Sequence, residues 1–427
     1  MKHASLARSA LLIVAALATL TPTAGWAPQA PAAPAPPKAP VAPKAPAGPK
    51  APSGPNAPAQ IGDQAPSKGK TPRAAGIWYG VPKAPAKKAG AIRLAAYNVE
   101  NLFDPVDDPK LSGEYDDITM VTKDGRLRAI ADAIRRLDAD VLCLEEMEGL
   151  DALKWFRDTY LKDMGYAHMA SEDVGYYRGV EQSVLSRYPI TKVTTFVDED
   201  LTDMEARRQG QGWAGRKADQ GKSFQRSPLR VDVDVDGWPL TVYVVHFKAG
   251  GREFEYHRES EALQVIEFVE RDMKADPSAC AAVLGDFNAT PSTRTVKAFA
   301  DAGLRSAYDF RGVKQGNTKD LYTTHDSGRA IDFIFMTPAL AKAAVDSSFF
   351  VLGTVHPSSD YDWRKDPDKS RIPDGYGSDH YPVAIDLMPA RGAGKGGTGK
   401  AGSGKAGAGA AAPAGALATD SKPASAR

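Results

Sequence analysis

The sequence predicts an α+β fold in which β-sheets are sandwiched between helices. Across residues 91–390, strand-like apolar runs mix with segments whose apolar residues recur at helical spacing. Several strand-like runs are apolar throughout, which is typical of sheets covered on both faces. The strand-like runs also end in a carboxylate, an amide or an imidazole, which points to a site at one edge of a sheet.

Four segments show the spacing of amphipathic helices. In the first, apolar side chains recur every three or four positions, at Leu127, Ile130, Ala131, Ile134 and Leu137. The predicted helices are Arg126–Leu137, Leu150–Leu161, Arg258–Met273 and Val296–Ala302.

Eight segments are short enough, and apolar enough, to be strands. One of them, Leu229–Val235, alternates Val and Asp strictly, as expected of a strand with one buried face. The others are Ile92–Asn98, Ala139–Leu144, Gln182–Ser186, Leu240–Phe247, Cys280–Leu284, Ala330–Met336 and Tyr381–Leu387.

The two ends of the chain differ in composition from the body. Residues 1–27 have a positive start, an apolar run too short to span a bilayer and small residues after it, the pattern of a secretory signal peptide. Residues 28–90 are rich in Pro, Ala and Lys and repeat Pro-Lys-Ala-Pro, which predicts an extended, disordered linker. Residues 391–427 predict a flexible tail rich in Gly, Ala and Lys. The body, 91–390, is expected to be one catalytic domain.

The net charge of +1 conceals a division of charge along the chain. Residues 1–90 carry +10 and residues 391–427 carry +5, so the body carries −14. The basic arms can contact polyanions such as DNA or an anionic surface, or they can be solvated spacers. An acidic body argues against gripping DNA through bulk charge, and it suits an enzyme that gathers a metal cation.

The chain has two cysteines, Cys143 and Cys280, each in or beside an apolar strand-like run. The sequence leaves open whether they pair, and two buried free thiols is the prediction adopted. No thiol chemistry is implied.

The polar residues at the predicted strand ends suit hydrolysis of a phosphate ester. Carboxylates can hold a hard cation that polarises a phosphoryl oxygen, and a histidine held by a carboxylate can take a proton from water. Amides and a second histidine can stabilise the charge of the transition state. These strand-end residues are Asn98, Glu145, Glu146, His246, Asp286, Asn288, Asp332, Asp379 and His380.

Six segments that carry these residues resemble, in order, the motifs of the endonuclease/exonuclease/phosphatase superfamily, which has the deoxyribonuclease I-like fold. They are Tyr97-Asn98-Val99-Glu100-Asn101-Leu102-Phe103-Asp104, Asp140-Val141-Leu142-Cys143-Leu144-Glu145-Glu146, Val245-His246-Phe247-Lys248, Gly285-Asp286-Phe287-Asn288, Ile331-Asp332-Phe333-Ile334 and Ser378-Asp379-His380-Tyr381-Pro382. The resemblance implies a four-layer α/β/β/α sandwich of two mixed sheets flanked by helices. The opening Asn-Val-Glu-Asn-Leu-Phe-Asp is similar to that of bacterial secreted nuclease-type members.

The resemblance also implies a role for each residue. Glu146 is the expected principal metal ligand, assisted by Asn98 and Asp379. Asp286 and Asn288 position the water or the phosphate. The remaining roles are a general base made of His380 oriented by Asp332, a phosphate-contacting histidine at His246 oriented by Glu181, and a phosphate-binding arginine at Arg226.

Two positions depart from the family pattern. Met147 and Glu148 follow Glu146 where bovine-type deoxyribonuclease has an arginine for the DNA minor groove, so minor-groove reading of that type is in doubt. Glu145 replaces the usual glutamine and adds an acid near the metal, and the alternative role is that of a solvated neighbour. Separately, residues 205–226 place basic residues around Trp213 and Phe224, which predicts a nucleic-acid-binding loop or a solvated one.

The function predicted from these features is a secreted or periplasmic, monomeric nuclease that uses Mg²⁺, or Mn²⁺ or Ca²⁺, and takes DNA or RNA as substrate. A sphingomyelinase C-like lipid phosphodiesterase is the alternative, although the body lacks the apolar hairpin that such an enzyme needs. An inositol polyphosphate phosphatase is disfavoured because Arg329-Ala330-Ile331-Asp332-Phe333 lacks that branch's motif. Export disfavours a DNA-repair nuclease, and the complete set of acids and histidines disfavours a binding module.

Overall fold

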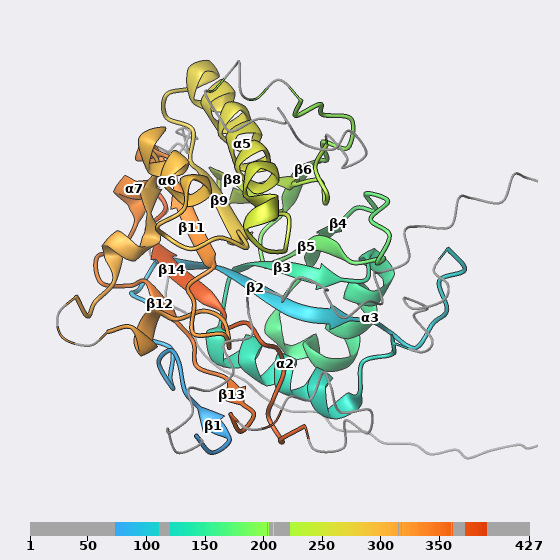
Figure 1. Cartoon of the computed structure of the whole chain (residues 1–427). Helices are drawn as coiled ribbons and strands as arrows, with labels where there is room; N and C mark the ends of the chain where they lie inside the picture. Colours follow the sequence, from blue (N-terminus) through green and yellow to red (C-terminus); the bar gives the residue numbers. More distant parts are fainter. Residues whose placement is uncertain are drawn as a thin grey trace, which may run out of the picture. The chain divides into compact units, whose positions relative to one another are not determined.

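The computed structural model describes residues 73–110, 120–202, 204, 208, 223–314, 316, 318–359, 361 and 372–390. These residues form two mixed six-stranded sheets with helices on the outer faces (Figure 1). The fold class predicted from the sequence is therefore confirmed. The predicted signal peptide and tail, and most of the predicted linker, lie outside the described residues.

The first sheet has the strand order β12-β14-β2-β3-β5-β4. Strands β2 and β3 are parallel, and the other neighbours in this sheet are antiparallel. Its strands are β2 (Ile92–Leu102), β3 (Val141–Met147), β4 (His168–Ser171), β5 (Glu181–Ser186), β12 (Phe350–Val351) and β14 (Val383–Leu387).

The second sheet has the strand order β10-β11-β9-β8-β7-β6. Strands β8 and β9 form its parallel pair. Its strands are β6 (Ile190–Thr194), β7 (Leu229–Val235), β8 (Trp238–His246), β9 (Ala281–Asp286), β10 (Arg305–Ser306) and β11 (Asp332–Met336).

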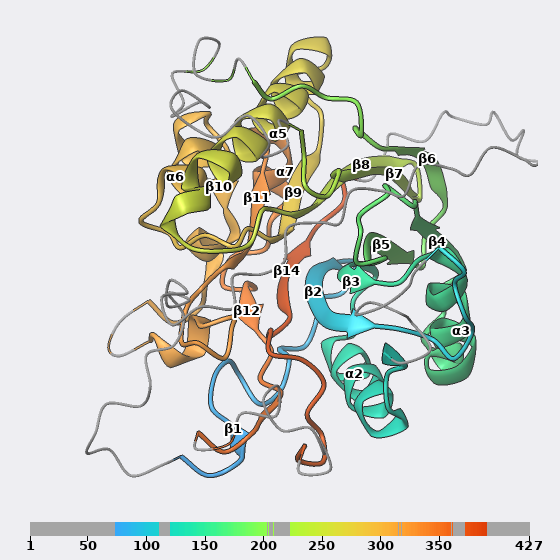
Figure 2. The same cartoon turned by 45° about the vertical axis from the view of Figure 1, so that its right-hand side comes forward.

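Helices cover the outer face of each sheet, which gives four layers (Figure 2). Helices α2 (Asp124–Leu137) and α3 (Leu150–Tyr160) pack on the first sheet through one apolar core. Helices α5 (Glu255–Ala275) and α6 (Arg294–Asp301) pack on the second sheet through another. A third core lies between the sheets. A short helix, α7 (Pro338–Ala343), follows β11.

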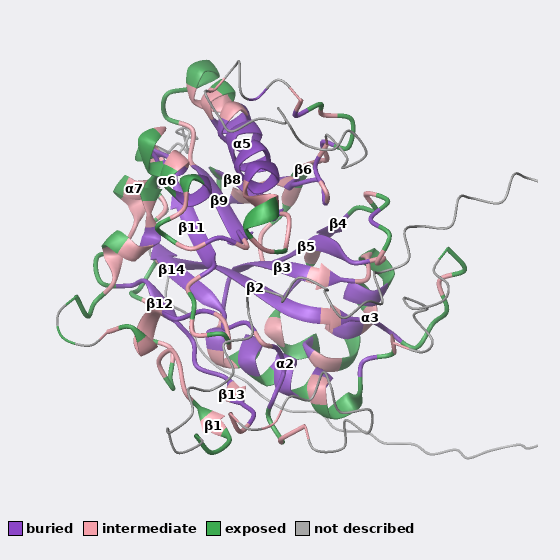
Figure 3. Ribbon diagram, in the orientation of Figure 1, coloured by how far each residue is buried: buried purple, intermediate pink, exposed green. Residues whose placement is uncertain are grey.

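Strand β2 shows why these strands are apolar on both faces. Leu94 and Ala96 point into the core between the sheets, whereas Ala95 and Tyr97 point into the core under the helices. Side chains alternate between the two faces of a strand, so a strand covered on both sides needs apolar residues at every position. The central strands of both sheets are accordingly mostly buried, whereas the edge strand β6 is partly exposed, and the helices are exposed on their outer faces (Figure 3).

The described chain starts before the domain boundary expected from the sequence. Residues 73–90, assigned above to the linker, include β1 (Gly76–Ile77), which pairs with β13 (Val355–His356). The ring of Trp78 stacks on that of His356 at 3.8 Å, and Lys87 Nζ lies 2.9 Å from Asp140 Oδ2. The domain therefore includes these residues, whose Trp and Tyr distinguish them from the Pro-Lys-Ala-Pro tract.

Both cysteines are free, as predicted. Cys143 is buried in the core between the sheets, whereas Cys280 is only partly buried at the start of β9. Among the described helices, none is long and apolar enough to cross a membrane.

Candidate active site

The parallel strand pairs bring the predicted site residues to one edge of the two sheets. Glu145 and Glu146 lie near the end of β3, and Glu145 is paired with Asn98 of β2. In the second sheet, His246 at the end of β8 is paired with Asp286 at the end of β9. Asp286 is in turn paired with Asp332, which begins the antiparallel strand β11. Because β14 runs antiparallel to β2, the residues that precede it reach the same edge.

Irregular backbone at this edge places several of the side chains. Glu100, Asn101, Glu146 and Asn288 have φ angles of 54°, 55°, 65° and 47°, in the left-handed region that non-glycine residues seldom adopt. The pairing of β2 and β3 shifts register between Asn98 and Leu102. Such backbone costs free energy and is concentrated at functional sites.

Glu100, which the sequence analysis did not single out, holds the segment before β14 against β2. Its Oε2 accepts hydrogen bonds from the backbone N–H of Asp379 at 3.0 Å and from the Tyr376 hydroxyl at 2.7 Å. The Ser378 hydroxyl donates to the carbonyl of Asn98 at 2.7 Å and accepts from the N–H of His380 at 3.1 Å. These bonds fix Asp379 and His380 relative to the first sheet.

Asp286 lies at the centre of the site. Its Oδ2 accepts hydrogen bonds from the side-chain amides of Asn288 at 3.1 Å and Asn98 at 3.3 Å. The same oxygen lies 3.4 Å from Nε2 of His246 and 3.7 Å from Nε2 of His380. Burial raises the pKa of Asp286 to about 6, against the opposing charge of His380. Asp286 therefore joins both amides and both histidines.

His380 and Asp332 form the pair expected from the family resemblance. Nδ1 of His380 lies 3.0 and 3.1 Å from the two Asp332 oxygens, and both side chains are buried. This contact assigns the proton to Nδ1 and leaves Nε2 facing the site. Burial lowers the pKa of His380, but the carboxylates of Asp332, Asp286 and Asp379 outweigh burial and hold it well above its usual value.

His246 experiences the opposite electrostatic environment. Burial, with the positive charges of Arg226 and Arg178, holds the pKa of this imidazole well below its usual value. Its Nε2 faces the site, at 3.4 Å from Asp286 Oδ2 and 3.8 Å from Glu146 Oε1. The two histidines thus differ in charge preference although both face Asp286, which is a common sign of divided acid–base roles.

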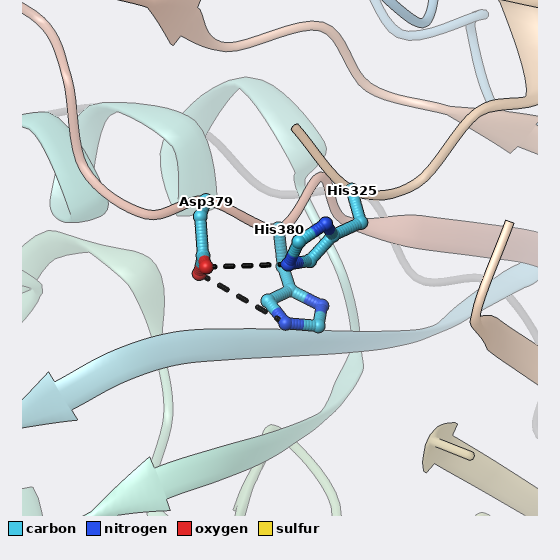
Figure 4. Close-up of side chains that lie close together, drawn as sticks. All are labelled: His325, Asp379 and His380. Atoms are coloured by element: carbon cyan, nitrogen blue, oxygen red, sulfur yellow. Dashed lines mark ion pairs between the residues drawn. The ribbon is translucent and has the colours of Figure 1, made fainter. Parts of the chain in front are cut away.

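His325 is a residue of the site that the sequence analysis missed. Its Nε2 lies 3.2 Å from Asp379 Oδ2, and the other oxygen of Asp379 lies 3.9 Å from Nε2 of His380 (Figure 4). The backbone N–H of Ser327 donates to Nδ1 of His325 at 3.0 Å. This bond helps to fix the ring with Nε2 directed toward Asp379. His325 lies in a turn, where no periodic pattern could mark it.

Glu145 is an acid close to the site residues, and it is buried, so the alternative of a solvated neighbour is wrong. The residue is 0% exposed, and neither carboxylate oxygen has a hydrogen-bond partner. Burial and the nearby charges of Asp332 and Asp286 raise its pKa well above the usual value, so it is held as a neutral acid. Gly285 has a φ of 129°, and a Cβ atom there would clash with the carbonyl oxygen of Val245 and lie 2.6 Å from Glu145 Oε1, which explains the glycine. A neutral acid can both donate and accept a hydrogen bond, as the amide of the family's usual glutamine can.

Arg226 is buried, and all three of its guanidinium nitrogens contact protein atoms. Nε donates to the carbonyl of His246 at 2.9 Å, Nη2 to that of Phe247 at 2.7 Å, and Nη1 to the Tyr176 hydroxyl at 3.1 Å. The structure thus shows Arg226 supporting the His246 segment. A direct phosphate contact by Arg226 stays a prediction.

Glu181 is close to the site but does not contact His246. Among the described residues, no hydrogen bond or ion pair joins these two side chains, and one Glu181 oxygen is buried without a partner. Burial, reinforced by Asp173, raises the pKa of Glu181 to about 8. In this structure the expected orienting contact is replaced by the contacts of His246 Nε2 with Asp286 and Glu146.

The predicted nucleic-acid-binding loop lies largely outside the described residues, which omit 205–207 and 209–222. Three of its described members are engaged in the domain. Phe224 is buried in the core under α5, Arg226 is buried as above, and Arg208 Nη1 lies 2.7 Å from Glu270 Oε2. These three residues therefore give no support to an exposed loop that contacts nucleic acid.

The donor set at this edge fits a divalent cation. Oxygen atoms predominate, from Glu146, Asp286, Asp332, Asp379 and the amide of Asn98, and such donors favour Mg²⁺, Mn²⁺ or Ca²⁺. Two groups bring three ligand atoms within 4.8 Å of one another, namely Asp286, Asp332 and His380, and His325, Asp379 and His380. Of the three predicted metal ligands, Asp379 belongs to the second of these groups. Glu146 lies beside His246, and Asn98 beside Asp286.

The fold and this cluster of acids and histidines define a hydrolase of phosphate esters. The model of the Endonuclease/Exonuclease/phosphatase family matches residues 97–380, and the chain belongs to that family. Its members are phosphoesterases that depend on divalent metal ions. No curated protein matches the sequence.

Solved structures similar to this chain include three members of the same fold. The catalytic domain of human Nocturnin with bound sulfate anion is 16% identical and has a TM-score of 0.44, over 71% of this chain and 97% of that chain. An endonuclease/exonuclease/phosphatase from Bacteroides vulgatus is 16% identical, TM-score 0.45, over 70% and 99%. One from Beutenbergia cavernae is 19% identical, TM-score 0.44, over 70% and 72%.

Proposed function

We propose that this protein is a secreted or periplasmic nuclease that hydrolyses phosphodiester bonds of DNA or RNA with the help of a divalent metal ion. The observation that carries the proposal is the pair His246 and His380, whose Nε2 atoms lie 3.4 and 3.7 Å from one oxygen of Asp286. In this pair, His380 is suited to accept a proton, and His246 is suited to stabilise negative charge on the phosphate. Cations flank it on the His246 side, which suits an anionic substrate.

Glu146, Asp379 and Asn98 are the residues proposed to hold the metal ion. When bound, a divalent cation neutralises charge on the phosphate and on the surrounding carboxylates, which also brings the pKa of His380 back toward its usual range.

In the proposed mechanism, His380 is the proton acceptor. Asp332 keeps the proton on Nδ1, so Nε2 presents a lone pair to water. The water oxygen bonds to phosphorus as its proton passes to Nε2. The phosphorus–oxygen bond to the leaving group then breaks, and the leaving oxygen takes a proton from solvent. Asp286 and Asn288 position the water and the phosphate.

His246 is proposed to stabilise charge on the phosphoryl oxygens. Its lowered pKa keeps the ring uncharged at neutral pH, and Nε2, which faces the site, can donate an N–H to the phosphate. A donor fixed in a buried site stabilises developing charge more than water does. Arg226 supports this arrangement through the carbonyl of His246.

The composition of residues 1–27 supports export, and the basic segments on either side of an acidic domain support contact with polyanions. The fold and the metal site by themselves serve several phosphodiesters. The choice of nucleic acid over a lipid substrate is therefore the part of the proposal that needs a direct test.

The test is cleavage of supercoiled plasmid and of single-stranded RNA by the full chain, with Mg²⁺, Mn²⁺ or Ca²⁺, and with EDTA. We expect metal-dependent nicking that His246→Ala and His380→Ala each reduce by about 10²–10⁴-fold. His168→Ala is the matched control, because His168 lies at the end of β4 that pairs with Ser186, at the opposite end of β5 from the site.

Loss of nicking in both site variants, with His168→Ala unaffected, supports the proposal. If the folded protein cleaves no nucleic acid with any of these ions but hydrolyses sphingomyelin, the nuclease assignment is wrong and the lipid phosphodiesterase alternative replaces it.

A further inference from the structure

A pocket of about 310 Å³ adjoins the active site on the His246 side and is lined by three cationic side chains, Arg178, Arg226 and Lys248. Lys248 lies two residues after His246, and the guanidinium of Arg226 donates to the carbonyl of His246. Arg178 reaches Glu146, at 3.5 Å from its Oε2. The pocket is therefore continuous with the proposed catalytic residues.

Two of these cations have no acidic partner. Among the residues that the structure describes, no carboxylate forms an ion pair with Lys248 or Arg226. The Lys248 ammonium lies 4.0 Å above the ring of Phe254, and the Arg226 guanidinium lies 4.9 Å above that of Tyr176. Arg226 is 3% exposed, and a buried cation without a counter-ion is costly. An anion in the pocket would relieve that cost.

The electrostatic field of the pocket reaches neighbouring groups. Burial and then Arg226 lower the pKa of Lys248, more than Glu261 and Glu253 raise it. Arg226 and Arg178 also lower the pKa of His246. The pocket is thus positively charged in spite of the acidic residues around it.

We propose that Arg178, Arg226 and Lys248 form a subsite for a second phosphate of the substrate, adjacent to the phosphate that is hydrolysed. This inference rests on the proposed function and narrows it to a substrate with consecutive phosphates, a nucleic-acid strand. Tyr177, whose side chain is 62% exposed, lines the same pocket and offers a ring on which a base can stack.

The charge of the pocket disfavours the lipid alternative. A phosphocholine headgroup has a single phosphodiester, and its second charge is a quaternary ammonium. Three cations beside the site repel that ammonium, whereas they attract the next phosphate of a strand.

The test measures binding and cleavage by the full chain with Lys248→Gln. Binding of a fluorescent single-stranded oligodeoxynucleotide is followed by anisotropy in the His380→Ala background, across a range of salt. Cleavage of the same oligonucleotide is compared with hydrolysis of bis(p-nitrophenyl) phosphate, which has one phosphodiester. Lys274→Gln is the matched control. Arg258, near the start of α5, donates to the carbonyl of Lys248 at 3.0 Å, and the exposed Lys274 lies 16 residues further along the helix, about 24 Å away.

We expect Lys248→Gln to weaken oligonucleotide binding about tenfold and to reduce the slope of log affinity against log salt by about 0.7–1. The loss of kcat/KM on the oligonucleotide should exceed that on the small diester by about tenfold. Lys248→Arg, which keeps the charge, should restore most of the binding, and Lys274→Gln should match the parent.

Equal losses on the two substrates, or an unchanged salt slope, would overturn the subsite. The nuclease proposal can fail separately: if Lys248 governs oligonucleotide binding but no strand is cleaved with any metal ion, the subsite stands and the catalytic assignment falls. Binding of zwitterionic phosphocholine vesicles that depends on Lys248, with none for the oligonucleotide, would reject the nucleic-acid strand.

Discussion

Nε2 of His325 lies 3.2 Å from Oδ2 of Asp379, and the other Asp379 oxygen lies 3.9 Å from Nε2 of His380 (Figure 4). His325 is itself fixed by the N–H of Ser327 and by a bridge between its backbone and that of His380. The imidazole acts on the metal site through Asp379 and is a positioning residue in this sense.

Replacing His325 should weaken metal binding before it affects the chemical step. We expect His325→Ala to raise the Mg²⁺ concentration for half-maximal activity about tenfold, because Asp379 loses the donor that orients it. His325→Gln, which keeps a donor, should recover part of the effect. Stabilisation against heat by added Mg²⁺ should show the same order without relying on turnover. A lower kcat at saturating Mg²⁺, with unchanged metal dependence, would contradict the positioning role.

Glu145 offers a test of a neutral buried acid. Because its pKa is raised well above the usual value by burial and by Asp332 and Asp286, it has no charge to lose. Glu145→Gln should therefore fold as the parent does and keep kcat/KM within about threefold, since the amide has the same shape and hydrogen-bonding groups. Glu145→Lys, which forces a charge into the core, should not yield folded protein. A hundredfold loss in the glutamine variant would mean that Glu145 acts as a carboxylate.

Glu181 should make stability depend on pH. Its pKa is about 8 in the fold against a usual value of 4.5, so the folded state keeps a proton that the unfolded chain has lost. The free energy of unfolding should then fall as pH rises from about 4.5 to about 8. Glu181→Gln removes this dependence on pH. Between pH 5 and pH 8, the free energy of unfolding of the variant should therefore rise relative to that of the wild type by up to about 4 kcal/mol. Urea unfolding at both pH values measures the gain, with the exposed Glu172→Gln as control.

A buried ion pair joins strand β2 to the last strand, β14. Arg93 Nε lies 2.7 Å from Asp386 Oδ1 and Nη2 lies 3.1 Å from Oδ2, with both side chains buried. Asp386→Ala leaves a guanidinium without its partner and should lower the free energy of unfolding by about 3–5 kcal/mol. Removal of Asp124, the exposed partner of Arg128, should cost much less. Equal effects of the two substitutions in urea unfolding would contradict this view.

Periodicity predicted the central elements well and the edges poorly. The strand predicted over Leu229–Val235 is confirmed residue for residue as β7, because its alternation matches a strand with one buried face. Strand β6 was not predicted, since as an edge strand it is largely exposed and lacks an apolar pattern. Strands β10, β12 and β13 have two residues each, too few for any period.

The site, like the fold, was predicted well in some parts and poorly in others. Strand-end position predicted a site at one edge of a sheet, and Asp286 and Asp332 do meet there because they are paired in β9 and β11. The contact of Asp332 with His380 joins the two sheets, and it was implied by the family resemblance rather than by any local pattern. The contacts of Arg226 with two backbone carbonyls depend on the path of the chain after β8, and no local pattern encodes that path. The pairing of His325 with Asp379 joins residues 54 positions apart through a turn, and it was equally invisible.

Strand β14 lies inside the first sheet, between β12 and β2, although it is the last strand of the chain. Asp379 and His380 immediately precede it, so its insertion is the step that completes the site. A chain still emerging from the ribosome lacks His380, the proposed proton acceptor, until nearly 380 residues have been made. Under the proposed function, a partly made chain is therefore inert toward the nucleic acids of the cell that produces it.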